Sequence, residues 1–236
     1  MRTPVCIQDY VDFISGGTPF AQANYGDGEW ACLTGLPGQN CNGEHYSAPL
    51  ALELVKTILH PPSGYVWYGS NPGKRLETSV QHWLLERGLT QRVWVYKEII
   101  SGANVNGKLR PFIEAVRGRK TVLVGPKHLC NGDLHKLWNI KAQVSVPTAD
   151  AFLAYTRTLN ETVDMLDEHK PELMLVCSGM AANPLIHDMF RKYPHITMID
   201  MGATLDPYAG VFSRKGYRKP GFQEHALAKN LEGLRV

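Results

Sequence analysis

The chain has 236 residues, of which 44% are hydrophobic and 20% are charged, and its formal net charge is +3. This composition is ordinary for one α/β domain, or at most two small ones, and excludes a miniprotein that needs disulfides or a metal to fold. The five cysteines are scattered and form no CxxC pair, which argues against a disulfide framework or a zinc site. No apolar run approaches the roughly 20 residues that cross a bilayer, so we expect no membrane contact and a cytoplasmic location.

Positive charge is concentrated near the C-terminus. Residues 211–236 contain six cations and two anions, a local net charge of +4 that leaves −1 for the other 210 residues. The cations are Arg214, Lys215, Arg218, Lys219, Lys229 and Arg235. Such a segment is either a solvated terminus or a contact for a polyanion such as DNA. We therefore predict one domain over residues 1–210 and a basic C-terminal tail over 211–236.

The first half of the chain contains helical and extended patterns in alternation. Apolar residues recur at helical spacing over 7–14, 50–59 and 76–85, which predicts a helix in each range. Short extended segments are predicted over 20–25 and 66–68. The first of these runs directly into a Gly-Asp-Gly-Glu string, so that string follows a predicted strand.

The second half has clearer alternation of strands and helices. Apolar runs predict buried strands over 121–124, 144–146, 173–177 and 196–200. Helices are expected over 149–166 and 183–190, the second with Asn183 as N-cap and Pro184 in its first turn. This order predicts an α/β, Rossmann-like fold, a mostly parallel sheet with helices on both faces. Ligands of such sheets bind beyond the carboxyl ends of the strands.

Asp27 and Glu29 are the first candidates for chemistry. They lie two residues apart, just beyond a predicted strand, with Asp27 between two glycines and Glu29 directly after the second. Two carboxylates on one face of an extended segment can hold Mg²⁺ or Mn²⁺ and leave coordination positions open for a diphosphate. The glycines allow a phosphate-bearing ligand to approach the backbone. The alternative interpretation is a Gly-Asp turn with two solvated acids.

The surroundings of this acid pair resemble a known family. Residues 17–30 read Gly-Thr-Pro-Phe-Ala-Gln-Ala-Asn-Tyr-Gly-Asp-Gly-Glu-Trp. This is similar to the opening of the GT-D-type glycosyltransferases, first met as a domain of unknown function, whose signature is approximately Arg-Tyr-Gly-Asp-Gly-Glu. Segments 146–155, 176–179 and 199–208 are also similar, so that the resemblance runs from Ile7 to Tyr208.

The resemblance implies a Rossmann-like fold and metal-dependent transfer of a sugar from a nucleotide-sugar donor, with Asp27 and Glu29 serving Mn²⁺ or Mg²⁺. The chain departs from the signature at one position, because Asn24 stands where we expect arginine. A cation suited to the donor's phosphates is therefore missing there, and it must come from elsewhere unless the donor differs.

Three turns supply the predicted donor contacts. The backbone before the acid pair leads into the metal site, and two later strand-to-loop turns expose N–H groups that suit phosphates. Lys127 adds a point charge at one of these later turns. The predicted donor-binding residues are Asn24, Tyr25, Gly26, Gly125, Lys127, Ser178 and Gly179.

Asp206 and Glu29 are the predicted catalytic residues. Asp206 follows the last predicted strand, where a carboxylate can accept the proton of an acceptor hydroxyl. With Pro207 it is equally a turn initiator. Asp200, at the end of the same strand, is interpreted as a structural acid that bonds nearby backbone N–H groups.

The predicted function is metal-dependent glycosyl transfer to a hydroxyl acceptor, which is a glycan, a glycoprotein or a hydroxylated DNA base. Aromatic residues between positions 65 and 94 are either core or a surface that stacks on a sugar or an extruded nucleobase. The alternatives are a DNA-modifying transferase that acts on a nucleobase and a non-catalytic nucleic-acid-binding module that uses the basic tail. A serine hydrolase built on Ser178 is disfavoured because the GxSxG motif is absent.

Overall fold

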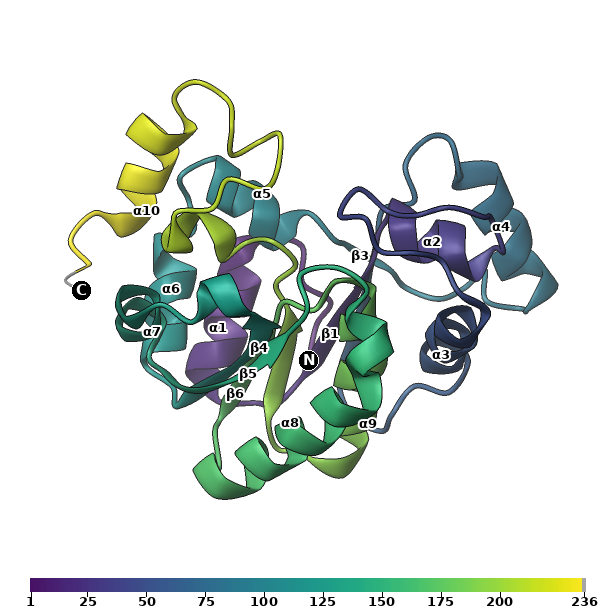
Figure 1. Ribbon diagram of the computed structural model, residues 1–236, viewed down its shortest axis with the longest axis horizontal. Coiled ribbons are helices and arrows are strands. Elements are labelled where there is room, and N and C mark those ends of the chain that lie inside the picture. Colours follow the sequence, from purple (N-terminus) through teal and green to yellow (C-terminus); the bar gives the residue numbers. More distant parts are fainter. Residues whose placement is uncertain (235–236) are drawn as a thin grey trace.

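A seven-stranded parallel sheet forms the centre of the computed structural model, which describes residues 1–234 (Figure 1). The strand order is β3-β2-β1-β7-β6-β4-β5, and every pairing is parallel. The strands are β1 (Ala21–Tyr25), β2 (Val66–Ser70), β3 (Val95–Tyr96), β4 (Thr121–Pro126), β5 (Ile140–Val146), β6 (Leu173–Val176) and β7 (Thr197–Asp200). The predicted α/β fold with a parallel sheet is confirmed. Arg235, one of the six C-terminal cations, lies outside the described residues.

Ten α-helices connect and cover the strands within residues 1–234. They are α1 (Ile7–Gly16), α2 (Asp27–Leu33), α3 (Ala48–Leu59), α4 (Glu77–Glu86), α5 (Ile99–Val105), α6 (Arg110–Arg117), α7 (Gly132–Trp138), α8 (Tyr155–His169), α9 (Ala182–Lys192) and α10 (Ala228–Leu231). Short 3-10 segments are Lys127–Leu129, Ala151–Ala154, Gly179–Ala181 and Asp206–Ala209, and Phe222–Leu227 is a π-helical turn. Over the described part of the chain, no helix has the length and apolarity that a membrane crossing requires.

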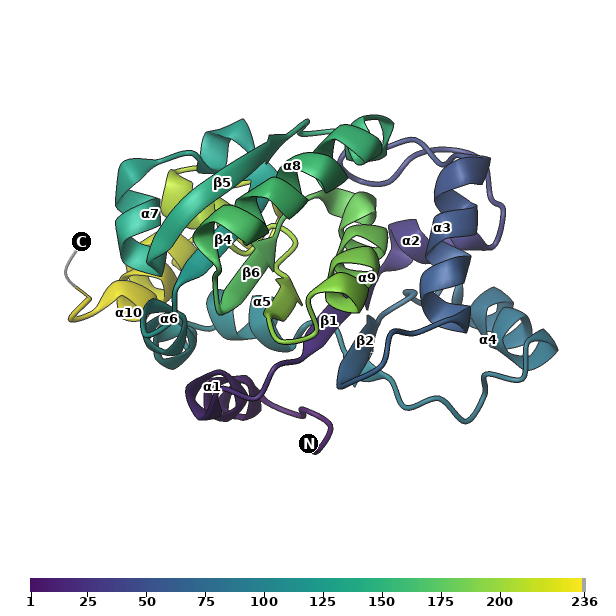
Figure 2. The ribbon, with the colours of Figure 1, turned by 90° about the horizontal axis from the view of Figure 1, so that it is seen from below.

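The two faces of the sheet are covered by different helices (Figure 2). Val122 and Val124 of β4 pack with buried residues of α8 and α9, whereas Leu123 packs on the opposite face with α1, α6 and α7. Successive side chains of a strand point to opposite faces, so one apolar run serves both layers. Helices α2, α3 and α4 surround a third cluster beside β1 and β2.

The sheet opens between β1 and β7. These strands pair only at Ala21 with Met198 and Gln22 with Ile199, and they separate toward their carboxyl ends. Strands β1, β2 and β3 follow one another to one side of this point, while β4 to β7 occupy the other side. A reversal of strand order leaves a crevice at the carboxyl edge because the connections leave on opposite sides.

Two local predictions are wrong. Asp27 begins helix α2 instead of lying on an extended segment, with Gly26 as the N-cap. Helix α9 begins at Ala182, so Asn183 is inside the helix and does not cap it. The Asn183 side chain is buried and bonds the backbone of Asn24 in β1, with the Asn24 N–H donating to Oδ1 at 3.1 Å and Nδ2 donating to the Asn24 carbonyl at 2.9 Å. A long-range contact thus replaces the local cap.

The C-terminal segment 211–234 packs onto α5 and α6 (Figure 1). Its Tyr217, Phe222 and Ala226 form a small buried cluster. Asn230 is fully buried, where its Oδ1 accepts a hydrogen bond from the Leu109 N–H at 2.8 Å. The described part of the basic segment is therefore folded against the domain.

Candidate active site

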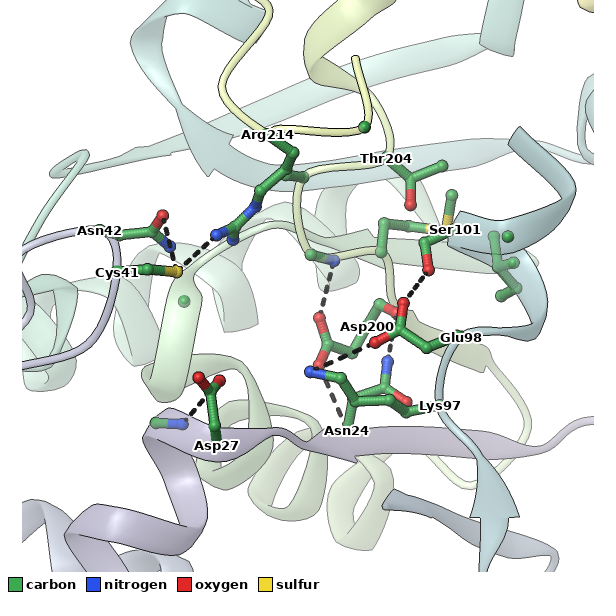
Figure 3. Close-up of a pocket in the computed structure, with 18 of the residues that line it drawn as sticks. Asn24, Asp27, Cys41, Asn42, Lys97, Glu98, Ser101, Asp200, Thr204 and Arg214 are labelled. Carbon is green, nitrogen blue, oxygen red and sulfur yellow. Dashed lines mark hydrogen bonds and ion pairs between the residues drawn. The ribbon is translucent and has the colours of Figure 1, made fainter. Parts of the chain in front are cut away.

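A cavity of about 560 Å³ lies beyond the carboxyl ends of β1 and β7 (Figure 3). Asp27 and Glu29 of α2 line one wall, and Lys97 and Glu98, which follow β3, line another. Asp200 stands at its base, at the end of β7. The loop 40–44 and Arg214 from the C-terminal segment also line the cavity. The cavity thus occupies the crevice that the strand order creates.

Asp27 and Glu29 have different surroundings in the cavity wall. Asp27 is exposed, and among residues 1–234 its carboxylate accepts a hydrogen bond only from the neighbouring Gly28 N–H, at 3.1 Å from Oδ1. Glu29 turns back toward its own helix, where its Oε2 accepts a hydrogen bond from the Gly26 N–H at 2.8 Å. Residues two apart on a helix do not lie one above the other as they do on one face of a strand, but both acids lie in the first turn of α2 and line the cavity. One carboxylate is open to a ligand, and the other is partly committed to capping α2.

The acids can supply only part of a metal's coordination. No group of three or more His, Cys, Asp or Glu side chains in residues 1–234 is arranged to hold a metal ion. Divalent cations with oxygen ligands commonly keep waters and bind through one or two carboxylates plus phosphate oxygens. The Asp27 and Glu29 carboxylates therefore fit a metal that takes its remaining ligands from a diphosphate and water.

Asp200 is a buried acid at the base of the cavity. Its Oδ1 accepts a hydrogen bond from the Gly202 N–H at 2.9 Å, and its Oδ2 accepts one from the Asn24 N–H at 3.2 Å. Burial raises the pKa of Asp200 to about 7. Burial is the largest cause of this rise; the Glu29 carboxylate also raises the pKa, and the two N–H donors and the Lys97 ammonium lower it. The cavity therefore contains a carboxyl group that changes its charge near neutral pH.

Two cations in the cavity were not predicted as site residues. Lys97 comes from the crossover after β3, and Arg214 comes from the C-terminal segment. The Arg214 Nη1 contacts the Cys41 Sγ at 2.7 Å, which joins the C-terminal segment to the loop 40–44 (Figure 3). Arg214 was visible in the sequence only as part of the basic tail. Nothing in the spacing around Lys97 relates it to the acids some 70 residues earlier.

The loop 40–44 is held against the end of β6 by Glu44. This side chain is buried, and it accepts a hydrogen bond from the Met180 N–H at 3.3 Å. Burial raises the pKa of Glu44. Gly179 has φ +56°, and a Cβ there would lie 2.1 Å from the Glu44 Oε1. Gly179 therefore serves both a left-handed backbone and the close approach of a carboxylate.

Four predicted site residues are brought together, namely Asn24, Asp27, Glu29 and Gly179, which all line the cavity. The predicted donor contacts Tyr25, Gly26, Gly125, Lys127 and Ser178 are not among its lining residues. The Tyr25 side chain is fully buried and donates a hydrogen bond to the Leu54 carbonyl at 3.2 Å.

Asp206 lies away from the cavity. It is buried at the start of a 3-10 segment, where Oδ1 is 2.9 Å from the His128 Nε2 and Oδ2 accepts a hydrogen bond from the Ser213 hydroxyl. These contacts tie together the β4 loop and the C-terminal segment. The structure thus brings Asp200, and not Asp206, to the cavity wall.

The aromatic residues between positions 65 and 94 do not line the cavity. Trp67, Tyr68 and Trp83 are buried in two apolar clusters, and Trp94 packs against the second of them. Tyr65 is 45% exposed and lies outside the cavity lining. For the buried members, core packing is the observed role.

The fold and the position of the cavity define a Rossmann-like α/β protein with a cavity at its topological switch point. No family model matches the sequence, and no curated protein matches it.

Three solved structures share the fold. One is described as a selenomethionine-substituted structure of domain of unknown function 1792, with a TM-score of 0.61 and 19% identity over 87% of this chain and 80% of that one. Another, described as that domain with a distinct glycosyltransferase fold, has a TM-score of 0.62 and 17% identity over 95% and 90%. A third, a new glycosyltransferase of that domain type from Streptococcus sanguinis, has a TM-score of 0.64 and 14% identity over 91% and 87%. This chain therefore has the fold of these glycosyltransferases.

Proposed function

We propose that this protein is a metal-dependent glycosyltransferase that moves a sugar from a nucleotide-sugar donor to a hydroxyl group. The observation that carries the proposal is the cavity at the β1/β7 switch point, lined by both Asp27 and Glu29, in a fold shared with solved glycosyltransferases. This combination favours a nucleotide-sugar enzyme over the hydrolase and over a non-catalytic module.

Asp27 and Glu29 would hold Mn²⁺ or Mg²⁺ at the cavity wall. The bound ion would neutralise charge that develops on the departing nucleoside diphosphate. Asp27 is suited to this role because its carboxylate is exposed and bonded only to an adjacent N–H. Glu29 would act through its second oxygen, since Oε2 caps α2.

Asp200 would accept the proton of the acceptor hydroxyl. In the proposed step the hydroxyl oxygen bonds to the anomeric carbon, and the bond from that carbon to the diphosphate oxygen breaks. The nucleoside diphosphate leaves with the electron pair, and the proton passes to the Asp200 carboxylate. A base is most effective when its pKa is near the working pH, and burial raises the pKa of Asp200 to about 7.

A donor screen tests the proposal. The protein is incubated with a panel of nucleotide sugars in Mn²⁺ or EDTA, and release of nucleoside diphosphate is measured together with the melting temperature in each nucleoside diphosphate. We expect at least one donor to be cleaved with Mn²⁺ only, and its diphosphate to raise the melting temperature. No cleavage and no stabilisation across the panel would overturn the proposal.

Asp27→Asn is the informative variant, and Asp133→Asn is its matched control. Both acids are exposed and lie in the first turn of a seven-residue helix, but Asp133 belongs to α7, away from the cavity. We expect Asp27→Asn to lower metal-dependent turnover by about 100-fold or more, the scale of losing a group that stabilises transition-state charge. Equal metal-dependent turnover in the two variants would overturn the proposal that Asp27 binds the metal.

On the acceptor side, we propose an anionic acceptor such as a polyanion, of which a hydroxylated DNA base is one case. A second groove of about 340 Å³ shares Val105, Asn106 and Gly216 with the cavity. Lys219, His225 and Lys229 line this groove, and no Asp or Glu among the described residues does. The basic segment thus presents cations beside the cavity that the donor would occupy.

Binding of a labelled ten-nucleotide single strand, measured by anisotropy at several salt concentrations, tests this acceptor class. Lys219→Gln with Lys229→Gln is compared with Lys120→Gln and Lys141→Gln, exposed lysines away from both cavities. We expect the first pair to weaken binding and reduce its salt dependence, and the second pair to change neither. Equal affinity in all proteins would favour a neutral glycan or glycoprotein acceptor. Nucleic-acid binding without any donor cleavage would favour the non-catalytic module.

A further inference from the structure

Lys97 is a partly buried cation that lines the cavity, and no sequence pattern pointed to it. Its side chain is 25% exposed, and it lies in the crossover that leads from β3 to α5. We propose that Lys97 binds the diphosphate of the donor, opposite the carboxylate of Asp27. This inference deepens the proposed function and rests on it.

Two glycines make the position of Lys97 possible. A Cβ at Gly26 would lie 2.2 Å from the Lys97 Nζ, so the ammonium occupies the space that a side chain at position 26 would need. A Cβ at Gly69 of β2 would lie 2.9 Å from the Lys97 Cβ and 2.1 Å from the Asn24 Oδ1. The backbone of β1 and β2 therefore orients the lysine toward the segment that carries Asp27.

The Lys97 ammonium has few partners inside the protein. Within residues 1–234 it donates no hydrogen bond, and Glu98 is the one carboxylate within ion-pair distance, with Nζ 3.9 Å from Oε1. The other oxygen of Glu98 accepts a hydrogen bond from the Ser101 hydroxyl at 2.6 Å (Figure 3). An ammonium has three donors, and those of Lys97 face the cavity without a bonded partner among the described residues. A ligand with several anionic oxygens would satisfy these donors.

The charges around Lys97 select a diphosphate over a simple anion. Asp27, Glu29 and Asp200 all line the same cavity, and their charges weaken the binding of an anion that carries no cation without preventing it. A diphosphate that carries a divalent cation presents both signs, with the cation toward Asp27 and free phosphate oxygens toward Lys97. Lys97 would then supply the positive charge that Asn24 does not provide at the end of β1.

A purely structural role for Lys97 makes a different prediction. The Lys97 charge also lowers the pKa of Asp200, so the lysine could serve only to balance that buried acid. In that case removal of the charge would change stability and the pH profile but leave diphosphate affinity unchanged. Affinity in the absence of metal separates the two roles.

The test is titration of inorganic pyrophosphate, UDP and GDP into the protein by calorimetry, first in EDTA and then in Mn²⁺. The variants are Lys97→Met, Lys97→Gln and Asp27→Asn, and Lys120→Met is the control with an exposed lysine away from the cavity. We expect both Lys97 variants to weaken diphosphate binding about 10- to 100-fold in EDTA, as for loss of charge-assisted hydrogen bonds. Lys97→Gln replaces the Met variant if the latter does not fold.

The outcomes separate a failure of the Lys97 proposal from a failure of the proposed function. Asp27→Asn should remove the gain in diphosphate affinity that Mn²⁺ gives. In EDTA its affinity should stay within about threefold of the native value, because loss of the Asp27 contact to the metal leaves the Lys97 contact to the phosphates in place. If Mn²⁺ strengthens binding through Asp27 but the Lys97 variants bind like the native protein, the role of Lys97 is overturned and the proposed function stands. If the native protein binds no diphosphate with or without Mn²⁺, both are overturned.

Discussion

The carboxyl edge of the sheet has two regions with similar sequence features and different structures. The β1 end and the β4 end are each followed by a glycine-containing turn, and we predict donor contacts at both. At β1/β7 the strands separate and Asp27, Lys97 and Asp200 surround a cavity. At β4 the corresponding space is filled.

Packing fills the β4 region. A Cβ at Gly125 would lie 3.0 Å from the Leu129 Cδ1 and 3.2 Å from the Cys177 Cβ, so this glycine permits close packing. Both carboxylate oxygens of Asp206 are engaged, one with His128 and the other with Ser213. The comparison teaches that a glycine and an acid at a strand end form a ligand site only where the neighbouring strands part, because only there is space left for a ligand. The predictions below test this contrast, from the largest expected effect to the smallest.

Asp200→Asn should have the largest effect on turnover. Loss of a general base costs typically 10²- to 10⁴-fold. In the native protein kcat/KM should rise with pH through about pH 7, where Asp200 loses its proton, and this limb should be absent from the variant. The pH profile of donor-dependent transfer, measured at saturating Mn²⁺, checks both. An unchanged limb in the variant would assign the ionisation to another group.

The same variant should change the pH dependence of stability. The pKa of Asp200 is raised from 3.8 to about 7 on folding, so between these values the folded state binds more protons than the unfolded state. Stability should therefore fall as pH rises from about 4 to about 7, by up to about 4 kcal/mol at 1.36 kcal/mol per unit. Asp200→Asn should flatten this part of the curve, as measured by urea unfolding at pH 5, 6, 7 and 8.

Gly179→Ala should destabilise the protein more than Gly125→Ala. At position 179 a methyl group meets the Glu44 carboxylate and the backbone has φ +56°, whereas position 125 has only tight apolar neighbours. We expect losses of about 2–4 kcal/mol and about 1–2 kcal/mol, from strain and overpacking respectively. Denaturant midpoints measure both, and Gly132→Ala, where no atom lies within 4 Å of the added Cβ, is the control.

Asp206→Ala should lower stability and leave turnover within about threefold of the native value. The substitution removes the hydrogen bonds of Asp206 to His128 and Ser213, which costs about 0.5–1.5 kcal/mol per bond because both partner groups can bond to water instead. Thermal unfolding and transfer rates at a temperature where both proteins are folded separate the two effects. A fall in turnover as large as that of Asp200→Asn would restore Asp206 as the catalytic base.

Lys127→Met should have the smallest effect. Lys127 is exposed at the β4 end and does not line the cavity, unlike Lys97. We expect its affinity for nucleoside diphosphates to stay within about twofold of the native value, because an exposed charge at a distance is screened by salt. Equal losses for Lys97→Met and Lys127→Met in the calorimetric titration would show that the β4 region also contacts the donor.

The main strands and most long helices could be predicted because each one carries its own pattern. Buried strands such as β4 and β6 are continuous apolar runs, and α3 and α8 show helical periodicity. Strand β3 has two residues and α5 has seven, which is too short for a pattern to stand out, so the segment that carries Lys97 went unassigned.

The sequence alone determined the α/β class, the acids at positions 27 and 29 and the uneven placement of charge, because composition and local periodicity express these directly. Tertiary structure decided which of the predicted residues meet. Lys97 reaches Gly26 only because β3 and β1 both flank β2, and Asp200 becomes a cavity acid only because β7 inserts next to β1. Contacts between residues some 70 to 170 positions apart depend on strand order and register, and no spacing within the sequence encodes them.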